Sequence, residues 1–211
     1  MKKGYFITLE GGEGTGKSTQ CRLLGDYLTR MGHKVLLTRE PGGSTGAEEI
    51  RNLLVTGDKS RWDSVTETLL FMAARRNHLV KRIWPALQDG QIVICDRFLD
   101  STLAYQGYGY GKNQQTLDMI QTIYHLIADD FQPDLTIVLD IDPAEGLRRS
   151  CSRAGNNEQR FESMDLNFHN NLRQGFLDLA RSNNRYAIVD ASAEIGQIQD
   201  QICRIVGERL G

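Results

Sequence analysis

The chain has 211 residues, 40% of them hydrophobic and 25% charged, and its 25 Lys and Arg against 27 Asp and Glu give a net charge of −2. This length predicts one domain, and the apolar fraction is enough for a buried core, which argues against intrinsic disorder. A general nucleic-acid-binding protein would carry a basic surplus that this chain lacks. No stretch of 18 apolar residues is present to cross a membrane. The apolar run before Glu10 is too short for a secretory signal, so none is expected.

The four cysteines, Cys21, Cys95, Cys151 and Cys203, lie far apart and form no C-x-x-C pair. Such cysteine usage is typical of a reduced protein with incidental thiols. The four histidines lack the spacing of zinc ligands, so no zinc site is expected. We therefore expect a cytoplasmic protein that binds neither nucleic acid nor a membrane.

Hydrophobic patterning predicts short apolar strands that alternate with helices along the whole chain. The strands are expected at 5–9, 34–38, 91–95, 135–139 and 186–189. The helices are expected at 17–31, 45–55, 66–87, 114–128, from 143 onward, 161–181 and 195–210, with a polar break at 154–157. This alternation predicts an α/β fold, a three-layer sandwich around a five-stranded parallel sheet. Since no repeat or linker divides the chain, residues 1–211 are expected to form one domain.

A glycine-rich segment follows the first predicted strand and opens the first predicted helix. Residues 11–18, Gly-Gly-Glu-Gly-Thr-Gly-Lys-Ser, match the P-loop pattern G-x-x-x-x-G-K-[ST] in full. Its backbone N–H groups and the positive end of the helix dipole would surround a di- or triphosphate. Lys17 is expected to reach the β- and γ-phosphates, and the Ser18 hydroxyl to ligate Mg²⁺. The expected ATP-binding residues are Gly11, Gly12, Glu13, Gly14, Thr15, Gly16, Lys17, Ser18 and Thr19.

The P-loop alone leaves the reaction open. The chain lacks the Asn-Lys-x-Asp tetrad of signalling GTPases, and motor and transport ATPases are usually larger. A small-molecule kinase needs a second pocket with cations for a charged acceptor. Asp96 and Arg97 end the strand 91–95, at the sheet edge where ligands bind in open α/β sheets. Asp140, at the end of the strand 135–139, competes for the role of magnesium-side carboxylate, and Asp96 is favoured.

Three further groups of residues could build this second pocket. Arg39 lies in Thr-Arg-Glu-Pro-Gly-Gly, a rigid turn after the second strand. Phe71 and Arg75 are four residues apart on one helix face, so they can engage one ligand. Each has a structural alternative, because a lone Phe is usually core and a lone Arg is usually solvated. Hydroxyls and an amide come shortly after Asp96-Arg97, from Ser101, Thr102, Tyr105 and Gln106.

Together these motifs resemble those of the thymidylate kinase family. The resemblance covers the P-loop at 10–18, Thr-Arg-Glu-Pro-Gly-Gly at 38–43, Leu-Leu-Phe-x-Ala-Ala-Arg at 69–75, Asp-Arg-Phe at 96–98, Ser-Thr-x-Ala-Tyr-Gln at 101–106 and Pro-Asp-Leu-Thr at 133–136. It implies a homodimer of the P-loop nucleoside-monophosphate-kinase type. The implied reaction is MgATP + dTMP to ADP + dTDP, and the implied small-molecule partners are ATP and dTMP.

By this resemblance, Phe71 stacks on thymine and Arg75 donates to its O4 atom. Gln106 or Thr102 contacts the base edge, and Tyr105 packs where a ribose 2′-hydroxyl would lie. Ser101 belongs to the same substrate-binding set.

The resemblance also assigns the phosphates and the metal. Arg39 and Arg97 would hold the acceptor phosphate, while Glu13 and Asp96 would organise Mg²⁺ and its waters, with Ser18 as the other metal residue. Many relatives carry Asp in place of Glu13, and some carry Arg in place of Gly14. The expected catalytic set consists of Lys17, Arg97, Asp96, Glu13, Arg153 and Arg160.

The last two residues belong to a cluster of arginines around the polar break: Arg148, Arg149, Arg153 and Arg160. The P-loop itself contains no arginine, so a transition-state arginine must come from elsewhere. A glycine- and asparagine-bearing break beside this cluster predicts a mobile lid at about 148–161. Arg153 is the first candidate and Arg160 the second. The alternative is a solvated basic face.

Two other functions stay open. A deoxynucleoside kinase would need a carboxylate base near a sugar hydroxyl, and the pair Arg39 and Arg97 favours a monophosphate acceptor instead. A nucleotide-dependent switch or assembly ATPase would hydrolyse ATP without a nucleotide acceptor.

Overall fold

The computed structural model describes residues 4–57, 61–151 and 159–211. Five parallel strands form a sheet with the order β2-β3-β1-β4-β5. The strands are β1 (Tyr5–Glu10), β2 (Val35–Arg39), β3 (Ile92–Asp96), β4 (Leu135–Asp140) and β5 (Tyr186–Asp190). All five predicted strands are confirmed, with their ends shifted by one residue at most.

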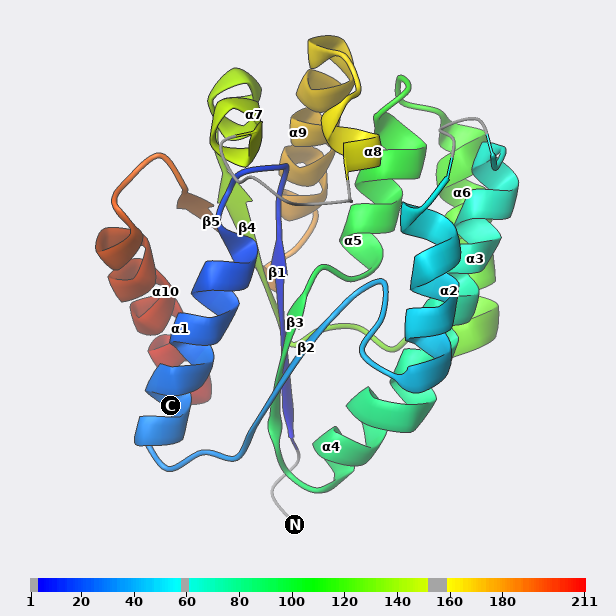
Figure 1. Cartoon of the computed structure of the whole chain (residues 1–211). Coiled ribbons are helices and arrows are strands. Elements are labelled where there is room, and N and C mark those ends of the chain that lie inside the picture. The colour runs from blue at the N-terminus through cyan, green and yellow to red at the C-terminus, as the bar shows by residue number, and fades with distance from the viewer. Residues whose placement is uncertain (1–3, 58–60, 152–158) are drawn as a thin grey trace.

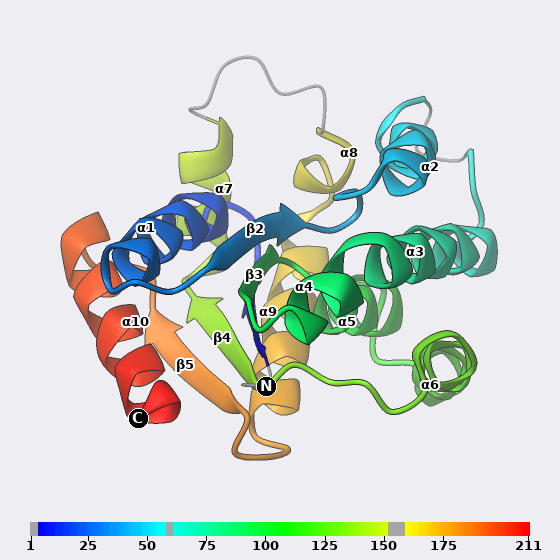
Figure 2. The same cartoon turned by 90° about the horizontal axis from the view of Figure 1, so that it is seen from below.

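Helices cover both faces of this sheet and make three layers (Figures 1 and 2). One face packs against α1 (Lys17–Arg30) and α10 (Ile195–Leu210). The helical elements between them in the chain are α2 (Thr45–Val55), α3 (Ser64–His78), η1 (Leu79–Ile83), α4 (Trp84–Gln88), α5 (Leu99–Thr102), η2 (Leu103–Tyr108), α6 (Gln114–Ala128), α7 (Pro143–Cys151), α8 (Gln159–Glu162) and α9 (Leu166–Ala180). No helix within the described ranges is long and apolar enough to cross a membrane.

The central strand β1 shows how the sequence divides the core. Ile7 and Leu9 pack into the core beneath α1 and α10, whereas Phe6 packs into the core on the opposite face. Because side chains alternate along a strand, Thr8 and Glu10 belong to the same face as Phe6. The strand therefore delivers a buried carboxylate, Glu10, to the point where the P-loop begins.

Two predicted helices differ from the structure. The helix expected at 66–87 begins at Ser64, because Asp63 accepts hydrogen bonds from the backbone N–H groups of Val65 and Thr66 at 2.9 and 3.0 Å. It contains the π-helical turn η1 before it continues as α4. The prediction of one helix over 161–181 is wrong, because Asp165 caps a new helix, α9, by accepting from the N–H of Phe168.

The short helical segment α5–η2, residues 99–108, was not predicted. It follows Asp96-Arg97 directly and carries the hydroxyl and amide side chains of the expected second pocket. Its second part is π-helical, a geometry that often occurs at functional sites. The polar break predicted at 154–157 lies outside the described residues.

Candidate active site

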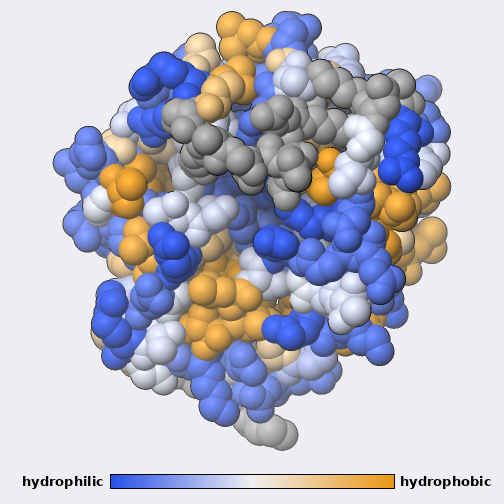
Figure 3. All heavy atoms as spheres, viewed as in Figure 1, coloured by the Kyte–Doolittle hydropathy of each residue, from blue (hydrophilic) through white to orange (hydrophobic). Residues whose placement is uncertain are grey.

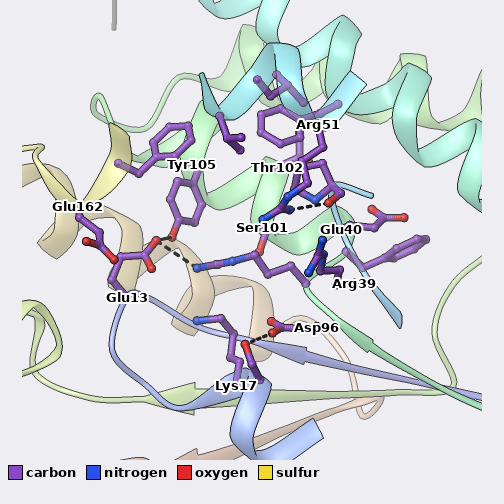
Figure 4. A pocket seen from close by; sticks show the side chains of 18 of the residues that line it. Glu13, Lys17, Arg39, Glu40, Arg51, Asp96, Ser101, Thr102, Tyr105 and Glu162 are labelled. Atoms are coloured by element: carbon purple, nitrogen blue, oxygen red, sulfur yellow. Dashed lines mark hydrogen bonds and ion pairs between the residues drawn. The ribbon is translucent and has the colours of Figure 1, made fainter. Parts of the chain in front are cut away.

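A cleft of about 360 Å³ opens where β1 and β3 end. Hydrophilic side chains gather across the middle of this face of the molecule (Figure 3). Residues of the P-loop, the β2–α2 loop, α2, α3 and α5–η2 line it (Figure 4). Ser150 of α7 and Phe161 and Glu162 of α8 also belong to the lining.

Lys17 is the buried cation of the P-loop. Its Nζ donates to the carbonyl oxygen of Gly12 at 2.6 Å and to Thr15 Oγ1 at 3.1 Å. Burial, reinforced by nearby Arg97, lowers the pKa of Lys17 to about 8, although Glu13 opposes the shift. A bound phosphate would supply the negative charge that favours the protonated ammonium group.

The P-loop lies tightly against α7. Gly14 has a φ of +69°, and a Cβ atom on it would lie 1.9 Å from the carbonyl oxygen of Gly146. Any side chain at position 14 would therefore displace α7. This contact gives a physical reason why this chain carries glycine at position 14.

The two expected metal residues meet at the end of the sheet. Ser18 Oγ donates to Asp96 Oδ2 at 2.5 Å (Figure 4). The competing carboxylate, Asp140, instead accepts two hydrogen bonds from Arg173, at 2.7 and 2.8 Å. It is also not among the residues that line the cleft. The geometry thus agrees with the preference for Asp96.

Arg97 joins the P-loop to the second pocket. Its guanidinium donates to the carbonyl oxygen of Gly11 at 3.0 Å, to Ser101 Oγ at 3.2 Å and to Glu13 Oε1 at 3.1 Å. The Tyr105 hydroxyl donates to the same Glu13 oxygen. Arg97 has a φ of 70°, an uncommon conformation for a non-glycine residue, and these partners hold it there.

This arrangement sets the charge of Glu13. Burial alone would raise its pKa, but Arg97 and Lys17 outweigh burial and hold the pKa of Glu13 below its usual value. Glu13 is therefore an anion within the P-loop, stabilised by the nearby charges of Arg97 and Lys17.

Glu10 supports the site by contacting residues that line the cleft, and the sequence analysis gave it no role. It is fully buried and accepts hydrogen bonds from the N–H of Phe98 at 2.8 Å and from Ser101 Oγ at 2.5 Å. Burial and the neighbouring Asp100 raise the pKa of Glu10 to about 7. A signal was present, because an apolar strand that ends in an acid directly before a P-loop is unusual for a core segment.

Arg75 is the centre of a buried polar chain on the other side of the cleft. Its Nε donates to Glu40 Oε2 at 2.7 Å, and its guanidinium also reaches Thr102 Oγ1 at 3.1 Å. The second Glu40 oxygen lies 3.0 Å from His78 Nδ1, and His78 Nε2 lies 2.7 Å from Thr38 Oγ1. Arg75 is thus a fixed, buried side chain of the cleft wall, which excludes the solvated alternative.

The structure brings most of the other predicted residues to the cleft as well. Arg39, 56% exposed, pairs with Glu48 at 3.2 Å, and Phe71 is half-buried in the lining. Gln106 Nε2 donates to the buried Glu67 at 2.8 Å. Thr19 is half-buried and does not line the cleft. Besides Glu10, the charged or titratable residues of the wall or its support that sequence reasoning missed include Glu40, Arg51, Glu67, His78 and Glu162.

The arginines of the expected lid divide into two pairs. Arg148 and Arg149 both donate to Glu145, and Arg149 also donates to the carbonyl oxygens of Ala191 and Ser192. Arg153 and the side chain of Arg160 lie outside the described residues.

A P-loop whose lysine faces a charged acceptor pocket, on a five-stranded parallel sheet, defines a nucleotide kinase of the P-loop class. The family model "Thymidylate kinase" matches residues 9–202. The chain is 48% identical to a thymidylate kinase of Ruegeria pomeroyi, over 96% of this chain and 94% of that protein. It is 47% identical to one of Caulobacter vibrioides over the full length of both. A crystal structure of thymidylate kinase from Ehrlichia chaffeensis matches with a TM-score of 0.77 and 36% identity, covering 97% of this chain and 99% of that one.

The chain therefore belongs to the thymidylate kinase family. It is a phosphotransferase, and the reaction of its family is ATP + dTMP to ADP + dTDP.

Proposed function

We propose that this cleft transfers the γ-phosphoryl group of MgATP to the phosphate of dTMP. The observation that carries the proposal is Arg97, which bridges the P-loop at Gly11 and Glu13 to Ser101 of the second pocket. One cation thus lies between the expected donor and the expected acceptor. A phosphate acceptor is already ionised, so the reaction needs positioning and charge neutralisation rather than a general base.

Ser18 and Asp96 would hold Mg²⁺. Both offer hard oxygen ligands, which this ion prefers, and they already lie together at the end of the P-loop. Bound there, Mg²⁺ would neutralise charge on the β- and γ-phosphates. Lys17 would add a positive charge to the same phosphates, while Glu13 would order the waters around the ion.

The acceptor phosphate would lie between Arg97 and Arg39, both of which line the cleft. Phe71 would stack on the thymine ring, Arg75 would donate to O4, and Thr102 or Gln106 would contact the base edge. Tyr105 would pack where a ribose 2′-hydroxyl would lie. Its hydroxyl group is bonded to Glu13, so its ring position is fixed.

We propose a homodimer on separate grounds. Three exposed apolar side chains, Val65 and Leu69 on α3 and Leu126 on α6, lie on two helices that neighbour each other (Figure 2). Where exposed apolar side chains form one patch, that patch marks an interaction site, and a second copy of this chain would cover it. All four cysteines are free thiols, which fits the proposed location in the reducing cytoplasm.

The test follows the label from ATP carrying a radioactive γ-phosphate. With Mg²⁺ and dTMP, the label should appear in dTDP. Transfer to deoxythymidine instead would identify a nucleoside kinase, and release of labelled phosphate without an acceptor would identify an ATPase.

A further inference from the structure

The amide of Gln106 has one bonded end and one free end. Its Nε2 donates to Glu67 Oε1 at 2.8 Å, and both side chains are buried. Its Oε1 is also buried, yet it accepts no hydrogen bond from the described residues. Leaving a buried acceptor without a partner is unfavourable, so such an atom points to a missing ligand. Gln106 lines the cleft, where that ligand would bind.

Glu67 determines which end of the amide is free. A carboxylate only accepts hydrogen bonds, so the NH₂ group of Gln106 must face it and the carbonyl oxygen must face away. The two residues come from different elements, Glu67 from α3 and Gln106 from the π-helical η2. The packing of η2 beside α3 therefore presents an acceptor to the base side of the cleft.

We propose that Glu67 is a positioning residue for base specificity, acting through Gln106. This inference rests on the proposed base pocket and adds the selection rule. Gln106 Oε1 accepts the N3–H of a thymine or uracil ring, while Arg75 donates to O4. A cytosine ring presents the opposite pattern, an acceptor at N3 and a donor at position 4. It therefore leaves buried groups of the pocket unpaired, which is the strongest form of discrimination.

Glu67 is distinct from the residues that position Arg75. Arg75 is held by Glu40 and Thr102, whereas Glu67 accepts a hydrogen bond from Gln106. A change at Glu67 therefore alters the reading of N3 while the donor to O4 stays in place.

Glu67→Gln tests the proposal, because a Gln at 67 can either accept from or donate to Gln106. Both amide orientations then become available. A site that is competent half of the time loses about twofold in affinity, so dTMP and dUMP should each lose only about twofold. dCMP should gain about tenfold or more, since the turned amide donates to its N3. Binding of the three nucleotides is measured by calorimetry, alongside kcat/KM.

Two variants separate this role from a structural one. Glu49→Gln makes the same change of charge on an exposed residue of α2 and should leave all three affinities unchanged. In a Gln106→Met background, Glu67→Gln should no longer favour dCMP, because the amide through which it acts is gone. Equal losses for dTMP and dCMP in Glu67→Gln, or no change in either, would overturn the proposal. If the unmodified protein does not prefer dTMP, the base pocket itself is wrong.

Discussion

Ser18 and Asp96, 78 positions apart in the chain, meet through a 2.5 Å hydrogen bond. The sheet explains the meeting, because β1 and β3 are parallel neighbours in which Leu9 pairs with Asp96. The loop that follows β1 therefore passes the end of β3. The register of the sheet thus brings together two side-chain oxygens from distant segments.

If this pair holds Mg²⁺, Asp96→Asn should raise the Mg²⁺ concentration needed for half-maximal activity by about 10–100-fold. The amide keeps the shape of the carboxylate but removes its charge. A Mg²⁺ titration of kcat at saturating nucleotides measures the shift. Asp140→Asn is the matched control, since Asp140 pairs with Arg173 instead. A larger shift in Asp140→Asn than in Asp96→Asn would show that Asp140, and not Asp96, holds the metal.

Lys17→Met should lower kcat/KM for the phosphoryl transfer by about 10²–10³ or more, because it removes a positive charge directed at the developing negative charge. It should not reduce the free energy of unfolding, since burial already disfavours the charged ammonium. Steady-state kinetics tests the loss of kcat/KM, and urea unfolding tests the free energy of unfolding. Near-normal turnover in Lys17→Met would refute the assigned role.

Glu10 should make stability depend on pH. Its pKa is about 7 in the folded chain and near 4.5 in the unfolded one. Between these values the folded protein holds a proton that the unfolded chain releases. The stabilisation is therefore full below pH 4.5 and is lost as the pH rises towards 7. Unfolding free energies of Glu10→Gln, subtracted from those of the unmodified protein across this window, should show the slope. A flat difference would mean that Glu10 is ionised in the fold throughout.

Arg75→Ala should lower kcat/KM for dTMP far more than for dCMP, because the donor to O4 is lost. It should also cost about 3 kcal/mol of stability, since Glu40 keeps its buried charge without its closest cation. Arg76→Ala is the control, because Arg76 is exposed and donates to the carbonyl oxygen of Ile127. Equal losses on dTMP and dCMP would show that Arg75 does not read the base.

Alanine substitutions in the expected lid should separate the two candidate transition-state arginines from the arginines that pair with Glu145. Arg153→Ala or Arg160→Ala should lower kcat by about 10²–10³ with little change in dTMP binding, as for an arginine that acts in the transition state. Arg148→Ala should stay near normal, because Arg148 is 74% exposed and pairs with Glu145. A normal kcat in all four variants, the fourth being Arg149→Ala, would contradict the lid hypothesis.

The predicted parts of the fold are those with a strong local pattern. The run Ile92–Cys95 is apolar and buried throughout, and the P-loop motif lies where the strand and helix signals place it. The segment 99–108 escaped prediction because polar residues and a glycine interrupt its apolar residues, so that no sustained helical or strand period results. The cap at Asp165 was equally hidden, since apolar spacing continues on both sides of it.

In the site, sequence reasoning identified side chains that are proposed to touch ligands and missed the residues that hold those side chains in place. His78 and Glu67 lie outside every motif of the sequence analysis, and Glu40 lies in the motif at 38–43 but was given no role there. Their roles arise from pairing across elements, such as Glu40 after β2 with His78 on α3. Partners this far apart in the chain become visible only when the tertiary packing is known.

The most direct measurement is ADP release in a coupled assay with MgATP and each nucleoside monophosphate in turn. The site described here predicts that dTMP supports turnover well above every other acceptor, with dUMP next because it shares N3–H and O4, and that dCMP and purine monophosphates support very little. ADP release at the same rate without an acceptor, or equally with dCMP and dTMP, would contradict the account.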